Sequence, residues 1–207
     1  MIAFIWDLDG TLLDSYEIIV NALHQIYVEK GVDIDKKEIL FDVTNESVSY
    51  FIKKTEAKFG IPFDDLKERY SIISGKEKLN IKPMQNAKEI LEILQSKGVH
   101  NFVFTHRGKT TDSVLTNIGI NSYFDEIVNS QNNFKRKPSP EGLSYLIDKY
   151  KLDRENTYYV GDRPIDIECA NNAQIKSILF IPKQSVIKPT GKETLVVKDL
   201  LEIQKLV

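Results

Sequence analysis

The feature that most constrains the fold of this 207-residue chain is an apolar segment that ends abruptly in two acids. Ile2–Trp6 is rich in β-branched and aromatic residues, and Asp7-Leu8-Asp9-Gly10 follows directly. A short, continuous apolar run predicts a strand buried on both faces, the kind found at the centre of a parallel sheet. An unpaired buried carboxylate is costly, so we expect both acids to have partners at the end of this strand.

The spacing of the two acids suggests a shared site. If the chain stays extended, Asp7 and Asp9 project to the same side, and Gly10 then allows a sharp turn. An ordinary Asp-Gly turn is the simplest alternative. A calcium-binding EF-hand would need a glutamate where Tyr16 stands, so that possibility is excluded. Carboxylates at the carboxyl end of a central strand suit Mg²⁺ beside a phosphate, with one acid as nucleophile and the other as acid and base.

The segment from Asp7 to Ser15 resembles the first motif of the haloacid dehalogenase superfamily in its phosphatase form. Three later segments of the chain also resemble motifs of this superfamily, and they occur in the order that the family shows. Each follows a predicted strand. Their shared order makes independent coincidence a poor explanation.

The second of these segments is Thr105-His106, which follows the apolar residues Phe102–Phe104. A hydroxyl and free backbone N–H groups at a strand end can hold phosphate oxygens. The resemblance implies that the Thr105 hydroxyl and the His106 N–H bind the transferring phosphoryl group. Taken alone, the segment could equally be the start of the next helix.

The third segment lies in the basic cluster Lys135-Arg136-Lys137, which alone would be read as solvated surface. Pro138 and Pro140 fix the register of a Lys-Pro-x-Pro motif on Lys137 rather than Lys135. The resemblance implies that Lys137 stabilises the nucleophile and the phosphate. A compact ammonium is suited to a place where several acids converge.

The fourth segment contains Gly161-Asp162 and a second acid, Asp166. The resemblance implies that Asp162 is a direct Mg²⁺ ligand, together with Asp7 and Asp9, and that Asp166 supports the site through water or Lys137. An N-cap before a helix with Pro164 near its start is the structural alternative.

The remaining patterns predict two parts of one fold. Residues 16–81 show helical periodicity without a convincing strand, whereas residues 82–207 alternate strands and helices, which predicts a parallel sheet with right-handed crossovers. We therefore expect an α/β, doubly wound, Rossmann-like core formed by residues 1–15 and 82–207, with an all-helical cap inserted at 16–81. This cap position resembles that of the phosphoglycolate phosphatase and β-phosphoglucomutase branch.

Composition narrows the function classes. The net charge is −2 and 28% of residues are charged, which gives no reason to expect nucleic acid or a membrane surface as partner. The single cysteine, Cys169, fits a reducing compartment, and the N-terminal apolar run is too short for a signal peptide, so we expect a cytoplasmic protein.

Gly108-Lys109-Thr110 is not a P-loop, because Val103 stands where that motif needs glycine. Cys169, His24 and His100 are interpreted as structural or surface residues.

The resemblance implies a Mg²⁺-dependent phosphohydrolase that acts on a small phosphorylated metabolite through an aspartyl-phosphate on Asp7. The dehalogenase alternative is disfavoured by the acid at Asp9. A phosphomutase shares all four motifs and stays open as an alternative, and a non-catalytic binding module is a weaker one. We expect a monomer or weak homodimer, hinges near Leu13–Ser15 and Leu79–Pro83, and substrate specificity in the cap. The residues expected to set specificity form a loop: Thr44, Asn45, Glu46 and Ser47.

Overall fold

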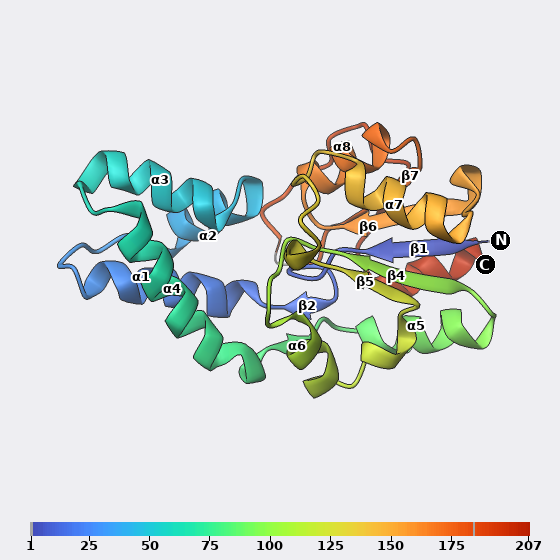
Figure 1. Cartoon of the computed structure of the whole chain (residues 1–207), viewed down its shortest axis with the longest axis horizontal. Helices are drawn as coiled ribbons and strands as arrows, with labels where there is room; N and C mark the ends of the chain where they lie inside the picture. Colours follow the sequence, from blue (N-terminus) through green and yellow to red (C-terminus); the bar gives the residue numbers. More distant parts are fainter. Residues whose placement is uncertain (1, 184) are drawn as a thin grey trace. The chain divides into compact units, whose positions relative to one another are not determined.

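The chain folds into two compact units (Figure 1). The computed structural model describes residues 2–183 and 185–207. Met1–Asp14 and Lys82–Val207 form the α/β unit, and Ser15–Ile81 forms the helical unit. Within the described ranges, no helix combines the length and the apolar character needed to cross a membrane.

The α/β unit is built on a parallel sheet of six strands, in the order β5-β4-β1-β6-β7-β8. The strands are β1 (Ala3–Trp6), β4 (His100–Phe104), β5 (Glu126–Val128), β6 (Thr157–Gly161), β7 (Lys176–Phe180) and β8 (Leu195–Val197). Strand β1 lies in the interior of the sheet, and all four of its residues are fully buried. The apolar character of this segment is explained by that position, since both of its faces are covered.

The register of the sheet brings the ends of three strands together. Trp6 at the end of β1 pairs with Val103 on one side and with Val160 on the other. Asp7 therefore follows β1 at the same edge of the sheet where Thr105 follows β4 and Asp162 follows β6. This carboxyl edge is where open α/β sheets bind their ligands.

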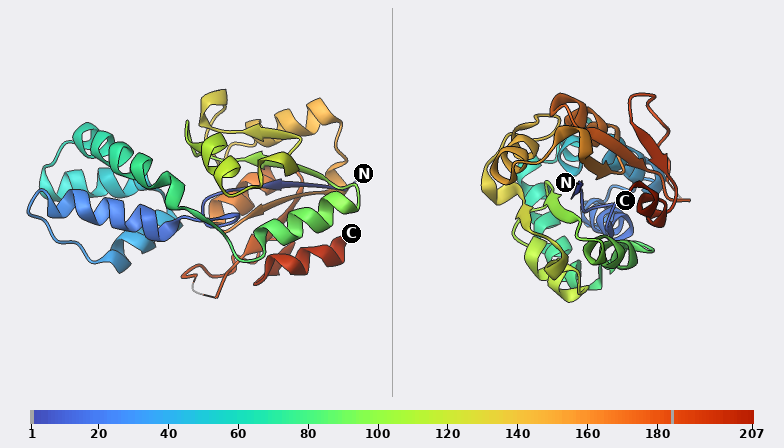
Figure 2. Two further views of the ribbon diagram at one scale, coloured as in Figure 1. Left: turned by 90° about the horizontal axis from the view of Figure 1, so that it is seen from below. Right: turned by 90° about the vertical axis from the view of Figure 1, so that its right-hand side faces the viewer.

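Helices cover both faces of this sheet (Figure 2). Helix α5 (Ala87–Ser96) packs with the C-terminal 3₁₀ helix η5 (Leu200–Leu206) on one face. Helices α7 (Glu141–Tyr150) and α8 (Pro164–Asn172) lie on the other face, where they bury Leu143, Leu146 and Ala170 against β-strand residues. The short helix α6 (Thr111–Asn117) follows β4, and three 3₁₀ turns complete the unit: η2 (Asn121–Tyr123), η3 (Ser130–Asn132) and η4 (Arg154–Asn156).

The chain leaves the α/β unit after Asp14 and returns to it at Lys82, and a small antiparallel strand pair connects these two places. Strand β2 (Leu13–Asp14) pairs with β3 (Lys82–Pro83). Sequence reasoning missed this pair, because two residues are too few to show an alternating pattern. The residues expected to act as hinges are thus partly fixed in a ladder.

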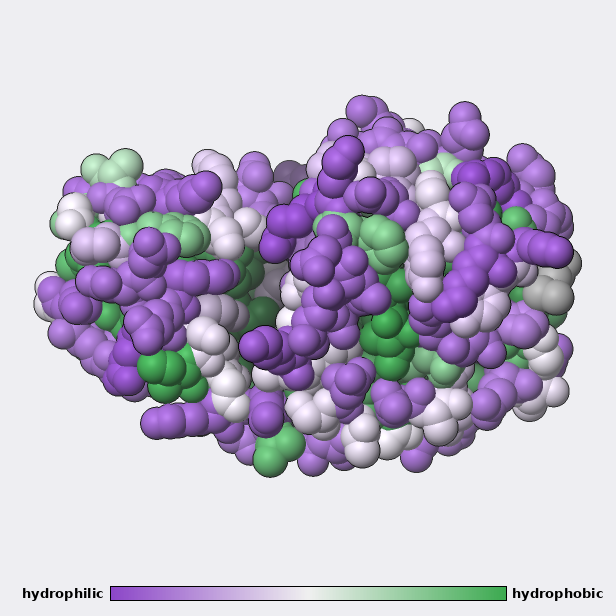
Figure 3. All heavy atoms as spheres, in the orientation of Figure 1, coloured by the Kyte–Doolittle hydropathy of each residue, from purple (hydrophilic) through white to green (hydrophobic). Residues whose placement is uncertain are grey.

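The helical unit contains α1 (Tyr16–Val28), α2 (Lys36–Asn45), α3 (Val48–Phe59), α4 (Phe63–Glu77) and the 3₁₀ turn η1 (Lys78–Asn80). It has its own apolar core, which includes Leu23, Tyr27, Ile39 and Phe51. Hydrophilic side chains dominate the face of each unit seen in Figure 3.

The predicted fold class is confirmed, because the sheet is parallel and doubly wound and a helical block follows its first strand. One detail was wrong. The loop expected at Thr44–Ser47 is shorter, because α2 continues through Asn45.

Candidate active site

Asp7 lies at the centre of the candidate site. It follows β1, its backbone N–H donates to the carbonyl of Val160 at 2.8 Å, and its side chain is buried. Oδ1 of Asp7 lies 3.0 Å from Nζ of Lys137, and Oδ2 lies 3.5 Å from Nη2 of Arg163. A buried carboxylate at a strand end, held between two cations, is kept ionised and in a fixed orientation.

Lys137 connects two carboxylates. Its ammonium is fully buried and lies 2.8 Å from Oδ1 of Asp166 as well as 3.0 Å from Asp7. The rings of Phe104 and Tyr159 lie 5.4 and 5.1 Å from Nζ, so aromatic faces complete its surroundings.

The charges of this cluster depend on one another. Burial opposes ionisation of Asp7, but Lys137 and then Arg163 outweigh it, so the pKa of Asp7 lies below its ordinary value. Burial also disfavours the charged form of Lys137, but Asp166 and Asp7 hold its pKa above the ordinary value. Asp7 and Lys137 are therefore both charged at neutral pH, and removal of either would leave the buried charge of the other short of a counterion.

Asp166 orients Lys137. Its Oδ1 accepts from the Lys137 ammonium, and its Oδ2 accepts the backbone N–H of Arg163 at 3.1 Å. Gly161 makes this packing possible, because a Cβ at position 161 would lie 2.4 Å from the Asp166 Cβ. The structure thus brings Asp166 against Lys137, with both carboxylate oxygens already occupied.

Asp9 lies on the turn that follows Asp7. Gly10 adopts a φ of +82°, and the backbone N–H groups of residues 11–13 all donate to the Leu8 carbonyl. The Asp9 carboxylate is 25% exposed and accepts a hydrogen bond of 2.5 Å from Nη1 of Arg107. An acid placed here can exchange protons with a molecule that enters the site from solvent.

Thr105 and His106 follow β4 on the opposite side of Asp7 from β6. The Thr105 hydroxyl oxygen accepts the backbone N–H of Arg107 at 3.2 Å, which leaves its own hydrogen available for another acceptor. The His106 ring makes a contact that was not expected, because its Nε2 accepts the backbone N–H of Lys137 at 2.8 Å. Burial, reinforced by Lys137, lowers the pKa of His106 to about 3.

Asp162 completes the acidic part of the site. It is buried, and its Oδ1 accepts a hydrogen bond of 3.2 Å from the Thr11 hydroxyl. The N-cap of α8 is Arg163, so Asp162 is not the capping residue that the structural alternative required.

The acids at this edge fit a divalent cation. Carboxylate oxygens of Asp7, Asp162 and Asp166 come within 4.8 Å of one another. Oδ2 of Asp7 is buried and accepts no hydrogen bond from the described residues, so a cation could use it. Asp7 and Asp162 are better suited as ligands than Asp166, whose two oxygens already accept hydrogen bonds. Oxygen donors of this kind suit a hard divalent cation.

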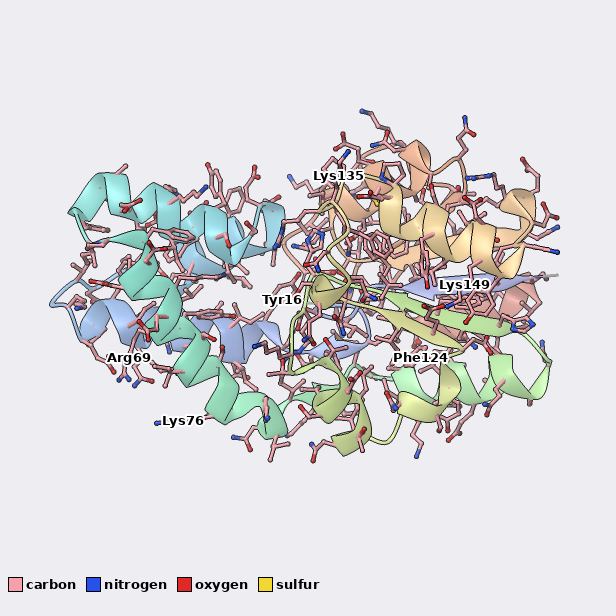
Figure 4. The ribbon with its side chains drawn as sticks, in the orientation of Figure 1. Tyr16, Arg69, Lys76, Phe124, Lys135 and Lys149 are labelled. Atoms are coloured by element: carbon pink, nitrogen blue, oxygen red, sulfur yellow. The ribbon has the colours of Figure 1, made fainter. Side chains whose placement is uncertain are left out.

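Lys135 and Arg136, the two basic residues before Lys137, lie in a different environment from the buried Lys137. Lys135 is exposed on the loop before α7 (Figure 4), and with Arg136 it lines a cavity of about 250 Å³. Thr105, His106 and Asn129 also line this cavity. The structure therefore separates the buried Lys137 from the solvent-accessible Lys135.

Two arginines of the site were missed by sequence reasoning. Arg107 contacts Asp9, and Arg163 contacts Asp7. The only sequence signal was adjacency, since each follows a motif residue within two positions. Neither position shows which acid its guanidinium reaches.

The four residues expected to set specificity lie in the helical unit. Thr44 is buried, and its hydroxyl donates to the Leu40 carbonyl at 2.8 Å. Asn45 donates to the carbonyl of Phe41, and the hydroxyl of Ser47 accepts the N–H of Tyr50 as the N-cap of α3. Glu46 is exposed at the end of α2.

The residues interpreted as structural are placed outside the acidic cluster. His24 lies 3.2 Å from Asp33, and His100 lies 2.9 Å from Asp125. Cys169 is buried and donates to the Ser139 carbonyl, and burial raises the pKa of its thiol to about 12.

Comparison with known proteins decides the family. The haloacid dehalogenase-like hydrolase profile matches residues 4–180. The chain belongs to the haloacid dehalogenase-like hydrolase family. The resemblance stated from the four motifs is confirmed, and so is the expectation that the protein is an enzyme of the hydrolase class.

Individual members of this family resemble the chain over most of its length. The phosphoglycolate phosphatase of Aquifex aeolicus is 27% identical over 187 residues, which cover 87% of this chain and 85% of that protein. The pyrophosphatase PpaX of Oceanobacillus iheyensis is 26% identical over 175 residues, which cover 84% and 80% respectively. The crystal structure of a predicted phosphoglycolate phosphatase from Haemophilus somnus matches 99% of this chain and 96% of its own, with a TM-score of 0.87 and 22% identity.

Proposed function

We propose that this hydrolase is a Mg²⁺-dependent phosphatase of small phosphate monoesters that acts through an aspartyl-phosphate on Asp7. The observation that carries the proposal is the buried contact of the Asp7 carboxylate with the Lys137 ammonium at 3.0 Å. Lys137 fixes Asp7 and places a positive charge where a phosphoryl group would arrive. Electrostatic stabilisation of this type is usually a large part of phosphoryl-transfer catalysis.

In the first step, a carboxylate oxygen of Asp7 attacks phosphorus, and the bond from phosphorus to the ester oxygen breaks. Asp9 gives its proton to the departing oxygen, so the alcohol leaves neutral. The Thr105 hydroxyl and the His106 N–H hold phosphoryl oxygens, and Lys137 balances their charge. Positioned proton transfer contributes about 10²–10⁴-fold in rate.

In the second step, Asp9 takes a proton from water as the water oxygen attacks phosphorus. The bond between phosphorus and Asp7 breaks, phosphate leaves, and Asp7 returns as a carboxylate. Asp7, Asp162 and the Asp9 carbonyl would hold Mg²⁺, which when bound offsets the negative charge of the phosphoryl group. Asp166 acts by keeping Lys137 in place.

The presence of the helical unit Ser15–Ile81 supports the proposal that a cap contacts the leaving group and sets substrate specificity. Because β2 and β3 are paired, we place the hinges of this cap at Ser15 and Ile81 rather than in the strands themselves. Of the residues expected to set specificity, Glu46 has an exposed side chain, whereas the Thr44 hydroxyl is already used within α2. The single cysteine supports a cytoplasmic reaction.

A phosphate-release screen tests the proposal. The purified chain is incubated with phosphoglycolate, pyrophosphate, sugar phosphates, nucleotides and flavin mononucleotide, with Mg²⁺ and with a chelator. The expected result is Mg²⁺-dependent release of phosphate from at least one compound. Interconversion of hexose 1- and 6-phosphates without free phosphate would indicate a mutase, and no turnover of any compound would contradict the proposal.

A further inference from the structure

Arg107 makes the one hydrogen bond that the Asp9 carboxylate accepts from the described residues. Its Nη1 lies 2.5 Å from Oδ1 of Asp9, and the guanidinium is less exposed than the carboxylate, at 12% against 25%. Asp9 otherwise sits on a turn beside Gly10, with little to fix its side chain. The orientation of Asp9 therefore depends on Arg107.

Arg107 is itself held at four points. Its Nε donates to the Thr110 hydroxyl at 3.1 Å, and its backbone N–H donates to the Thr105 hydroxyl at 3.2 Å. Its carbonyl accepts the N–H of Ser130 at 3.0 Å, and Nη1 reaches Asp9. The backbone of Arg107 is thus held by Thr105 and Ser130, and its guanidinium is held by Thr110 independently of Asp9.

A guanidinium has five donors and no acceptor and stays charged in proteins, so Arg107 cannot itself relay a proton. It binds Oδ1 of Asp9 and not Oδ2, so Oδ2 is the oxygen that we assign to an incoming group. Catalysis is sensitive to such placement, because a misplacement of about 1 Å can cost about 10²-fold in rate.

We propose that Arg107 is a positioning residue that aims the Asp9 carboxylate at the leaving-group oxygen. This inference rests on the proposed phosphatase function, in which Asp9 is the acid. Arg107 also couples the loop after β4, which carries Thr105, to the turn after β1. The phosphate-binding hydroxyl and the acid are thereby held in one fixed relation.

The positioning role predicts a difference between two kinds of substrate that a general loss of positive charge would not produce. A poor leaving group such as an alkyl alcohol needs the Asp9 proton when it departs, whereas p-nitrophenolate needs it little. The ratio kcat/KM reports only the steps up to that departure. Loss of Arg107 should therefore lower kcat/KM for an alkyl phosphate far more than for p-nitrophenyl phosphate.

The experiment is a double-mutant cycle of Arg107→Ala and Asp9→Asn, with both substrates and with Lys109→Ala as matched control. Lys109 is an exposed cation in the same loop. We expect Arg107→Ala to lower kcat/KM for the alkyl phosphate by about 30-fold or more, within the range that positioned acid catalysis contributes. The same change in the Asp9→Asn background should alter it less than threefold, because the group that Arg107 aims is already inactive. Lys109→Ala should resemble the wild type.

A second variant and a rescue keep the test decisive. Arg107→Gln keeps N–H donors but removes the positive charge, and ethylguanidinium should restore part of the alkyl-phosphate activity of Arg107→Ala while leaving that of Lys109→Ala unchanged. Equal losses on both substrates, or equal factors in the wild-type and Asp9→Asn backgrounds, would overturn the positioning role while leaving the phosphatase proposal intact. If the wild-type chain hydrolyses neither substrate nor any compound of the screen, it is the phosphatase proposal that fails.

Discussion

The backbone N–H of Lys137 donates a hydrogen bond of 2.8 Å to Nε2 of His106. Because Nε2 is the acceptor, the neutral imidazole carries its proton on Nδ1. The ring thus fixes the backbone from which the buried ammonium extends toward Asp7 and Asp166. His106 was expected to act through its backbone N–H, and the structure gives its side chain a second task.

This contact predicts a dependence of stability on pH. The pKa of His106 is about 3 in the folded protein, chiefly because of burial, against an ordinary value of 6.5. Between these values the unfolded chain binds a proton that the folded chain does not. The free energy of unfolding therefore falls as pH falls below 6.5, by up to about 1.4 kcal/mol per pH unit from this group.

Urea unfolding of the wild type and of His106→Gln between pH 7.5 and about 5 measures the effect. Glutamine keeps an acceptor but does not titrate, so the variant should lose less stability over this range. His100→Gln, which removes a histidine that contacts Asp125 rather than Lys137, is the matched control. Parallel curves for the wild type and His106→Gln would contradict the assignment.

Gly161→Ala tests the packing that holds Asp166. The added methyl group would lie 2.4 Å from the Asp166 Cβ, so the first turn of α8 must shift. We expect a loss of about 1–3 kcal/mol of stability, as for an overpacked core, together with a large loss of kcat. Gly75→Ala is the control, because nothing lies within 4 Å of its added Cβ and alanine in a helix should stabilise by about 0.5–1 kcal/mol. Wild-type turnover in Gly161→Ala would show that Asp166 need not be fixed.

Lys137→Ala and Lys135→Ala separate the two lysines of the basic cluster. The first leaves the buried carboxylates of Asp7 and Asp166 without their shared counterion, which should cost about 3–5 kcal/mol of stability and orders of magnitude in kcat. The second removes an exposed charge and should change either quantity little. Thermal melts and steady-state kinetics give both readouts. Similar losses of kcat in the two variants would mean that the buried contact between Lys137 and Asp7 has no specific role in catalysis.

Asp162→Ala should weaken Mg²⁺ binding and activity together. In the wild type, saturating Mg²⁺ should raise the melting temperature, because a ligand bound only by the folded state stabilises it by mass action. The variant should need at least about tenfold more Mg²⁺ for the same rise. Asp148→Ala removes an acid whose side chain is 76% exposed and serves as control. An unchanged Mg²⁺ titration in Asp162→Ala would place the cation elsewhere.

The strand-end acids could be predicted because their signals are local. An apolar run that stops at Asp7, and another that stops at Asp162, identify strand ends without any knowledge of neighbouring segments. Parallel topology then brings those ends to one edge. No single short segment of the sequence encodes the order of the strands in the sheet. The helical segments between successive strands do predict that crossovers connect the strands.

The arginine contacts could not be predicted, because they depend on side-chain directions across 98 residues for Arg107 and Asp9. The end of α2 was placed too early for a different reason. Thr44 and Asn45 are residue types that favour turns, yet here both donate to carbonyls one turn earlier and the helix continues. Local propensity was overridden by hydrogen bonds that the same side chains make within the helix.

The central claim is that Asp7 forms the covalent intermediate. During turnover with a good substrate, rapid quenching followed by borohydride reduction converts an aspartyl-phosphate to homoserine, which mass spectrometry locates in the sequence. We expect homoserine at position 7, and none in Asp7→Asn, which should fold normally and retain below about one percent of wild-type turnover. Homoserine at another aspartate, or phosphate release at wild-type rates by Asp7→Asn, would contradict it.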